Sequence, residues 1–150
     1  MNSLLLFRGA GGRRGQGLLE FAIVGFMFGI VLLAVVEIGR AVLVYATTAN
    51  AARVGARYAI VHGSSRTGTG ADGPSGPGSN PAQVVSVIEN IASAGLLTPA
   101  DLVITVSYPD ASNAPGSRVN VTVVYPYDAL TTFIPWTVRL GSTTEAVIRE

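Results

Sequence analysis

The sequence predicts an α+β fold in which a long N-terminal transmembrane helix leads into a small head, made of one short helix and a three-stranded antiparallel sheet. Apolar residues make up 49% of the 150 residues and charged residues only 13%, a composition that indicates a membrane segment. The uncharged stretch at residues 21–36 is the core of that segment. Towards the C-terminus, three stretches alternate apolar and polar residues, which is the pattern of half-buried strands.

The transmembrane helix is expected over residues 16–44, which exceed the roughly 20 residues that a helix needs to cross a bilayer. Glu20 and Glu37 bracket its uncharged core, and Arg40 follows Glu37 at i,i+3, where the two side chains can pair near the membrane interface. A cleaved signal peptide is the alternative, but its apolar region spans only about 7–15 residues. The arginines that precede the run favour a cytoplasmic N-terminus and an extracytoplasmic head.

Small residues mark two faces of this first helix. Within the membrane run, Gly25 and Gly29 form a GxxxG pair, on which another helix can approach closely, although such pairs also arise by chance. Beyond the membrane, the helix is expected to continue over residues 45–62. A packed face is predicted there from the helical spacing of Ala49, Ala52, Ala56 and Ala59. A second stripe, expected to face water, consists of Asn50, Arg53 and Arg57.

Residues 63–81 are rich in Gly, Ser and Pro and are expected to form a loop or linker. Gly68, Gly70 and Gly73 match the GxGxxG fingerprint of dinucleotide-binding proteins letter by letter. That fingerprint requires a strand before it and a helix opening from it, and the sequence predicts neither. Nucleotide binding is therefore not predicted.

The extracytoplasmic α+β head is expected over residues 82–150, beginning with the short helix. Asn80 is the expected N-cap, with Pro81 in the first helical position and Gln83 completing a capping box. Gly95 is expected to end the helix at the C′ position. One apolar face of this helix is formed by Val84, Ile88 and Ile91, flanked by Val85 and Ala92.

Three strands are expected at residues 102–108, 118–125 and 138–150, with their apolar side chains on one face. These side chains are Leu102, Ile104, Val106 and Tyr108, then Val119, Val121, Val123 and Tyr125, and more weakly Val138, Leu140, Ala146 and Ile148. The aromatic segment 126–136 is expected to be a lid over the sheet edge or a contact surface. So small a sheet needs cover on its apolar face, which the two helices can provide.

The residues give no indication of an enzyme, a metal site or a cofactor. HExxH, Walker A and GxSxG motifs are absent from the sequence. No metal-ligand spacing is found among the aspartates Asp72, Asp101, Asp110 and Asp128. His62, the single histidine, is expected to be a solvated residue. A net charge of +1 without a basic patch gives no indication of a nucleic-acid partner, and the lack of cysteine excludes thiol chemistry.

An ionisable residue inside a membrane segment indicates a function, and Glu20 is such a residue. Basic residues come first, then Gly15, then four residues, then Glu20 and the apolar run. This arrangement resembles the processing site of type IV pilins and pseudopilins. The resemblance implies that residues 1–15 are a basic leader, that a prepilin peptidase cuts between Gly15 and Gln16, and that Glu20 becomes the fifth residue of the mature chain.

Three stretches, GQGLLEFAIV, EIGR and ATTANAARVGARYAIVHG, are similar to the TadE-like family of tight-adherence (Tad/Flp, type IVb) pilus proteins. In the third stretch the matching residues are Ala51, Ala52, Arg53, Gly55, Ala56 and Arg57. Many relatives have a proline a few residues after the glutamate, where this chain has Gly25 and Phe26.

The family resemblance implies a minor pseudopilin, a structural subunit of the bacterial cytoplasmic membrane that acts in pilus biogenesis and adhesion. Its implied partners are the prepilin peptidase, other pilins and pseudopilins, and inner-membrane assembly proteins. In related pilins, the carboxylate that corresponds to Glu20 is thought to pair with the N-terminal amine of a neighbouring subunit, here that of Gln16. Two alternatives stay open: Glu20 only reaches the cytoplasmic interface, or the chain is an anchored extracytoplasmic binding module outside any filament.

Overall fold

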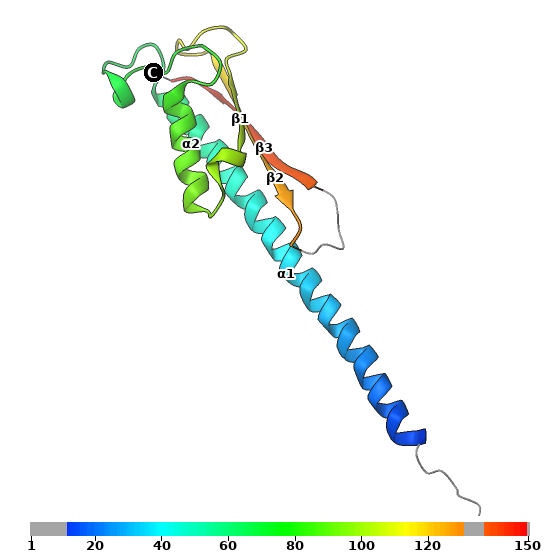
Figure 1. The fold of residues 1–150 in the computed structure, drawn as a ribbon. Helices are drawn as coiled ribbons and strands as arrows, with labels where there is room; N and C mark the ends of the chain where they lie inside the picture. Colours follow the sequence, from blue (N-terminus) through cyan, green and yellow to red (C-terminus); the bar gives the residue numbers. More distant parts are fainter. Residues whose placement is uncertain (1–11, 131–136, 150) are drawn as a thin grey trace, which may run out of the picture. The chain divides into compact units, whose positions relative to one another are not determined.

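The structure, a computed structural model, describes residues 12–130 and 137–149. The chain divides into two compact units, unit 1 (Met1–Ile38) and unit 2 (Gly39–Glu150). The elements, in chain order, are α1 (Gly12–Val61), the 3-10 helix η1 (Gly70–Asp72), α2 (Ala82–Ala94), the 3-10 helix η2 (Pro99–Asp101), β1 (Val103–Ser107), β2 (Arg118–Asp128) and β3 (Thr137–Val147) (Figure 1). The predicted α+β class, with a long apolar helix, one further α-helix and three strands, is confirmed.

The described part of unit 1 is the first half of α1. Its most apolar 18-residue window has a mean hydropathy of 2.6, and none of that window is buried against the rest of the chain. Length and composition make α1 the one helix in the described part of the chain that could cross a membrane. A helix that is apolar on every side needs lipid or other helices around it.

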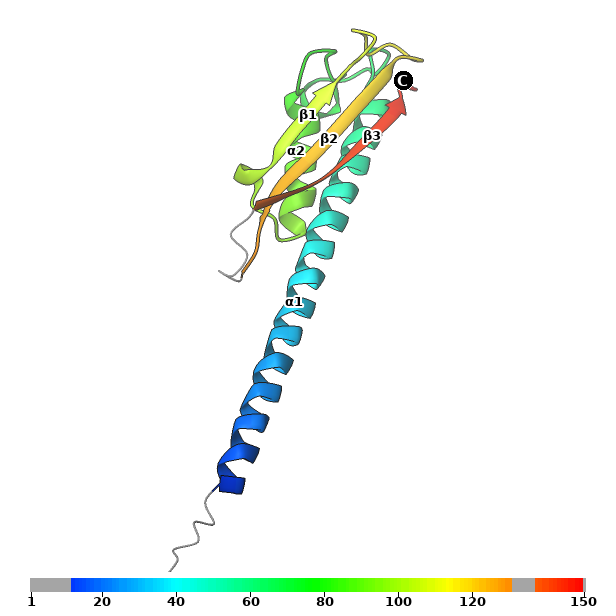
Figure 2. The ribbon, with the colours of Figure 1, turned by 90° about the vertical axis from the view of Figure 1, so that its right-hand side faces the viewer.

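Unit 2 is a two-layer structure in which two helices cover one face of the sheet (Figure 2). The strand order is β1-β2-β3, and both pairs are antiparallel, as predicted. Val121 of the central strand lies opposite Val106 on one side and Thr144 on the other. This register places the valines of alternate positions on the face that meets the helices.

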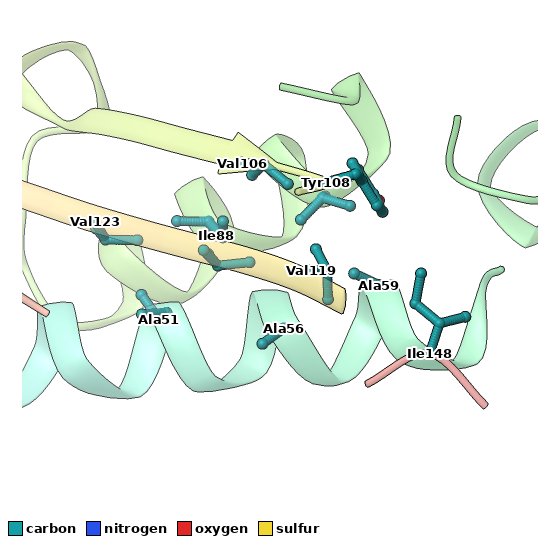
Figure 3. Close-up of a cluster of buried hydrophobic side chains, with 12 residues drawn as sticks. Ala51, Ala56, Ala59, Ile88, Val106, Tyr108, Val119, Val123 and Ile148 are labelled. Carbon is teal, nitrogen blue, oxygen red and sulfur yellow. The ribbon is translucent and has the colours of Figure 1, made fainter. Parts of the chain in front are cut away.

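The core of unit 2 lies between the sheet and the helices (Figure 3). The alternation predicted for the second strand is confirmed, because Val119, Val121 and Val123 are all fully buried. Towards them point Val84 and Ile88 of α2 and the alanines of α1, namely Ala51, Ala52, Ala56 and Ala59. Val138 departs from its predicted place, because it lies near the start of the edge strand and is 44% exposed.

The predicted start of α2 is wrong in its details. Pro81, not Asn80, is the N-cap, and no side chain caps the helix. Asn80 instead has a φ of 50° and binds β1, since its Oδ1 accepts from the Val106 N–H at 2.6 Å and its own N–H donates to the Val106 carbonyl at 3.1 Å. Gln83 donates its side-chain amide to the Gly70 carbonyl at 2.5 Å rather than completing a capping box.

The end of α2 also differs from its predicted form. Gly95 is the C-cap residue, with a φ of −89°, and Leu96 takes the left-handed conformation, with a φ of 64°. A Cβ on Gly95 would lie 2.3 Å from Cγ2 of Thr47. Glycine is therefore required at position 95 by close packing against α1, rather than by a turn with positive φ.

The loop of residues 63–81 is held to the head by hydrogen bonds around the buried Ser75. The Ser75 N–H and hydroxyl both donate to the His62 carbonyl, at 2.7 and 2.9 Å, and Tyr108 is 3.1 Å from the same hydroxyl. Because the Ser75 hydroxyl has already used its proton, Tyr108 is the donor in the last bond. Asn113 donates to the Ser75 carbonyl at 2.5 Å.

His62 is buried in this region, so its predicted solvation is wrong. Its ring stacks on Tyr58, with 3.8 Å between centroids, and its Nδ1 donates to the Tyr58 carbonyl at 2.8 Å. The two bonds from Ser75 hold the loop against the end of α1, where His62 is 8% exposed. Burial also raises the pKa of Tyr108.

Candidate functional site: the apolar helix and the small-residue face of α1

The predicted cleavage site lies at the start of α1. Gly15 and Gln16 are both helical and exposed, three and four residues after the first residue of the helix, Gly12. A Cβ added to Gly15 would meet nothing within 4 Å. The first turn of a helix lacks part of its hydrogen bonding, and a glycine weakens the turn further. The turn around the Gly15–Gln16 peptide bond can therefore unwind at a low cost in free energy. Residues 1–11 of the predicted leader lie outside the described part of the chain.

Glu20 lies one turn after Gln16 on the same side of α1 and is exposed. Among the residues whose side chains the structure describes, none forms a hydrogen bond or an ion pair with it. Its neighbours along the helix are bare apolar side chains, including Leu19 at 63% exposure and Phe21 at 78%. A carboxylate on such a surface is stabilised in a membrane only by a cation or donors from outside the chain.

Gly25 and Gly29 face open space, since a Cβ at either position would meet nothing within 4 Å. The glycines of unit 2 provide the contrast. At Gly55 a Cβ would lie 2.5 Å from Cγ1 of Ile88, and at Gly95 it would strike Thr47. Internal packing therefore explains Gly55 and Gly95, whereas no packing within the described chain explains the GxxxG pair.

The residues of the predicted family motif on α1 divide between two faces. The inner face is buried and made of small residues, which let α2 and the sheet approach closely: Ala51, Ala52, Gly55 and Ala56. Both arginines are exposed on the outer face, and so is Asn50, the third member of the predicted water-facing stripe. The small residues thus have a structural role in the core, and only Arg53 and Arg57 are available to a partner.

Arg40 has a contact with an aromatic residue of β2. Its guanidinium carbon lies 5.2 Å from the centroid of the Tyr127 ring, a cation–π arrangement. Tyr127 is far away in the sequence, so no local pattern could have revealed this contact. Glu37 belongs to unit 1 and Arg40 to unit 2, and their pairing stays a prediction.

Two of the aspartates in unit 2 form local bonds to neighbouring residues. Asp110 forms an ion pair with Arg118, 2.9 Å between Oδ1 and Nη2, and also accepts from the Arg118 backbone N–H at 2.9 Å. These bonds from Arg118 lower the pKa of Asp110. Asp128 accepts from the Thr137 hydroxyl at 2.7 Å. Within residues 12–130 and 137–149, no three potential metal-binding side chains come together.

Comparison with known proteins identifies the segment that contains these features. Residues 15–57 match the family model described as TadE-like protein. The match begins at Gly15 and ends at Arg57, so it includes the predicted cleavage site, the apolar run and the small-residue face. The chain matches no curated protein and no solved structure. The resemblance to the TadE-like family is therefore confirmed over residues 15–57, and this TadE-like segment indicates involvement in Tad pilus assembly.

Proposed function

We propose that the chain is a minor pseudopilin of a Tad/Flp-type pilus assembly system, anchored in the bacterial cytoplasmic membrane, with its N-terminus cytoplasmic and unit 2 extracytoplasmic. In this role the chain is a structural subunit and not an enzyme. The observation that carries the proposal is Glu20, an exposed carboxylate on a bare apolar helix, close behind the glycine at which the TadE-like match begins. An isolated carboxylate in such a place is a functional feature by default.

The first step in the proposed role is hydrolysis of the peptide bond between Gly15 and Gln16 by a prepilin peptidase. Water adds across this bond, which leaves a carboxylate on Gly15 of the released leader and an α-amino group on Gln16. The bond lies in the weak first turn of α1, and the lack of a side chain on Gly15 allows close approach of the peptidase. The product begins with a positive charge one helical turn before Glu20.

The second step is pairing between subunits. The new amine of Gln16 in one subunit meets the Glu20 carboxylate of its neighbour as their apolar helices pack together. Each charge offsets the cost of removing the other from water, and loss of one partner of a buried pair costs about 3–5 kcal/mol. The open surface at Gly25 and Gly29 provides a place where the neighbouring helix can approach.

Cleavage is tested by the intact mass and N-terminal sequence of the protein isolated from its native membrane. We expect the chain to begin at Gln16. A Gly15→Val variant should accumulate as the uncleaved precursor, because the added side chain obstructs the peptidase. Cleavage at another bond, or none in the wild-type protein, would contradict the proposed cleavage.

Pairing is tested by Glu20→Gln, with Glu37→Gln as the matched control at the other end of the uncharged run. We expect Glu20→Gln to be cleaved at least in part but to lose crosslinks to pilus components and to lose piliation, because the neutral amide cannot compensate the amine. Glu37→Gln should retain both. Normal piliation with Glu20→Gln would leave Glu20 as an interfacial residue, and a chain that is never crosslinked to pilins would be an anchored binding module.

A further inference from the structure

One end of unit 2 carries an apolar residue in an unusual conformation. Leu96 follows α2, is 87% exposed and has a φ of 64°. The left-handed region is a natural place for glycine and a strained one for leucine. A single exposed leucine is ordinary, but one that is also held in a strained conformation indicates a function for its side chain.

The turn at the end of α2 determines which side chains point outwards. The Leu96 N–H donates to the Ser93 carbonyl and the Leu97 N–H to the Ala92 carbonyl, both at 3.0 Å. Leu97 is buried in the turn, with 6% exposure, so Leu96 is turned away from the core. Close packing of Gly95 on Thr47 of α1 fixes the position of this turn.

Leu96 lies beside the first residues of unit 2. It lines one cleft, of about 470 Å³, together with Arg40 and Leu43 of α1. The charged residues facing this cleft are Arg40, Asp101 and Asp128. The side chains of α1 nearby are apolar and exposed, with Val42 at 60%, Leu43 at 53% and Tyr45 at 53%.

Chain length places this part of α1 at the membrane boundary. About 20 helical residues cross the hydrocarbon core, so a span that begins at Phe21 ends near Arg40. The headgroup region adds about 5–8 Å on that side, or roughly three to five helical residues, which reaches Tyr45. Leu43 therefore falls in the interfacial region, and Leu96 lies in the same cleft.

From this geometry we infer that the Leu96 turn is a second membrane contact, in which Leu96 enters the boundary between the headgroups and acyl chains of the bilayer that α1 spans. The occupant of this surface is phospholipid, because Leu43 in the same cleft and its neighbours Val42 and Tyr45 are apolar, exposed and within the interfacial stretch of α1. Asp101 and Asp128 outnumber Arg40 at the cleft, so the contact does not depend on anionic lipid. This inference requires only the membrane anchor and does not rest on a role in pili.

The test uses the full chain reconstituted in phosphatidylethanolamine–phosphatidylcholine vesicles. The chain has no cysteine, so Leu96→Cys provides a unique site for an environment-sensitive fluorophore. The matched control is Val147→Cys, an apolar position with 52% exposure in β3, near the backbone bond from Arg149 to Ile60 at the far end of α1. With brominated acyl chains, the probe at position 96 should emit at shorter wavelength and lose most of its emission, whereas the probe at position 147 should lose little.

Equal emission and equal quenching at positions 96 and 147 would overturn the inference. Quenching at position 96 that appears only after addition of phosphatidylglycerol would also overturn it, because an anionic headgroup would then be required. A measurement on the unmodified chain avoids any effect of the cysteine on folding. A phospholipid with a photoreactive acyl chain should label the peptide that contains Leu96, and labelling confined to α1 would contradict the proposed contact.

Discussion

At the scale of single residues, glycine has two different uses in this protein. Gly55 and Gly95 are needed because another side chain occupies the space of their missing Cβ. Gly25 and Gly29 have nothing within that space. The first two are therefore fixed by the fold of one chain, while the second two are available to a helix from another subunit.

Substitution of Gly55 should test the close packing between α1 and the rest of unit 2. The new methyl group of Gly55→Ala would lie 2.5 Å from Cγ1 of the fully buried Ile88, so that the Ile88 side chain or α1 must shift. Overpacking of this kind costs about 1–3 kcal/mol. Replacing a glycine inside a helix gains at most about 1 kcal/mol of helix propensity, so the cost of overpacking outweighs this gain. We expect a lower melting temperature of the full chain in detergent, while the control Gly76→Ala, where a Cβ meets nothing, should leave it unchanged.

The ion pair between Asp110 and Arg118 predicts a pH dependence of stability. Arg118 lowers the pKa of Asp110 in the folded state, so this carboxylate stabilises the fold above its unfolded pKa. That contribution is lost as the pH falls below about 4 and through the lowered pKa. We expect Asp110→Asn to lower the melting temperature at neutral pH and to approach the wild-type value in acid. Asp101→Asn, at an exposed position in η2, is the control that should show no such convergence.

At the scale of elements, the second half of α1 is part of the core of unit 2. Ala51, Ala52, Ala56 and Ala59 are almost completely buried against α2 and the sheet. A three-stranded sheet with one short helix cannot cover its apolar face without them. The helix α1 therefore begins in unit 1 and contributes to the core of unit 2.

Truncation should show this dependence directly. A fragment of residues 45–150 retains the buried alanines and should unfold cooperatively on heating. A fragment of residues 82–150 lacks them, exposes the valines of β2 and should show no cooperative transition by circular dichroism. Similar melting curves for the two fragments would contradict the packing of α1 in the core.

Limited proteolysis should distinguish the held part of the 63–81 loop from its exposed part. Ser75 is buried and hydrogen bonded, whereas residues 76–79 are exposed on the way to α2. We expect the first cleavage within residues 76–79, identified by mass spectrometry of the early products. A first cleavage in α2 would show that the loop is not the most accessible segment.

Local sequence patterns predicted the elements well and their long-range contacts poorly. The alternation of valines in β2 predicted its buried face correctly, because side chains two residues apart in a strand lie on the same face of the sheet. Asn80 was misplaced because its Oδ1 binds Val106, a partner far along the chain, in preference to the end of its own helix. The burial of His62 depended in the same way on Ser75 and the loop fold. Gly15, Gln16 and Glu20 were predicted from a family resemblance, whereas the Leu96 turn had no local pattern.

At the scale of the whole molecule, the two units have opposite relations to water. The described part of unit 1 exposes its large apolar side chains, whereas unit 2 buries a core of apolar side chains between its helices and its sheet. The proposed orientation places unit 2 outside the cytoplasm. A Ser65→Cys variant, altered at an exposed loop position in a chain without other cysteines, should react with a membrane-impermeant maleimide in intact spheroplasts. Labelling only after lysis would contradict the proposed orientation and place unit 2 in the cytoplasm.

The alanine face of α1 has a consequence for biosynthesis. Translation completes α1 before the valines of β2 and Ile148, just after β3, have been synthesised. The inner face of the helix therefore has no packing partners until much later in translation. A helix face of valine or leucine would be prone to aggregation during that delay, since exposed apolar surface promotes aggregation of incomplete chains. Alanine presents little apolar area, and the buried side chains of this core that are larger than alanine all belong to segments made after α1. The large buried side chains of the unit 2 core are thus synthesised only after the helix face on which they pack.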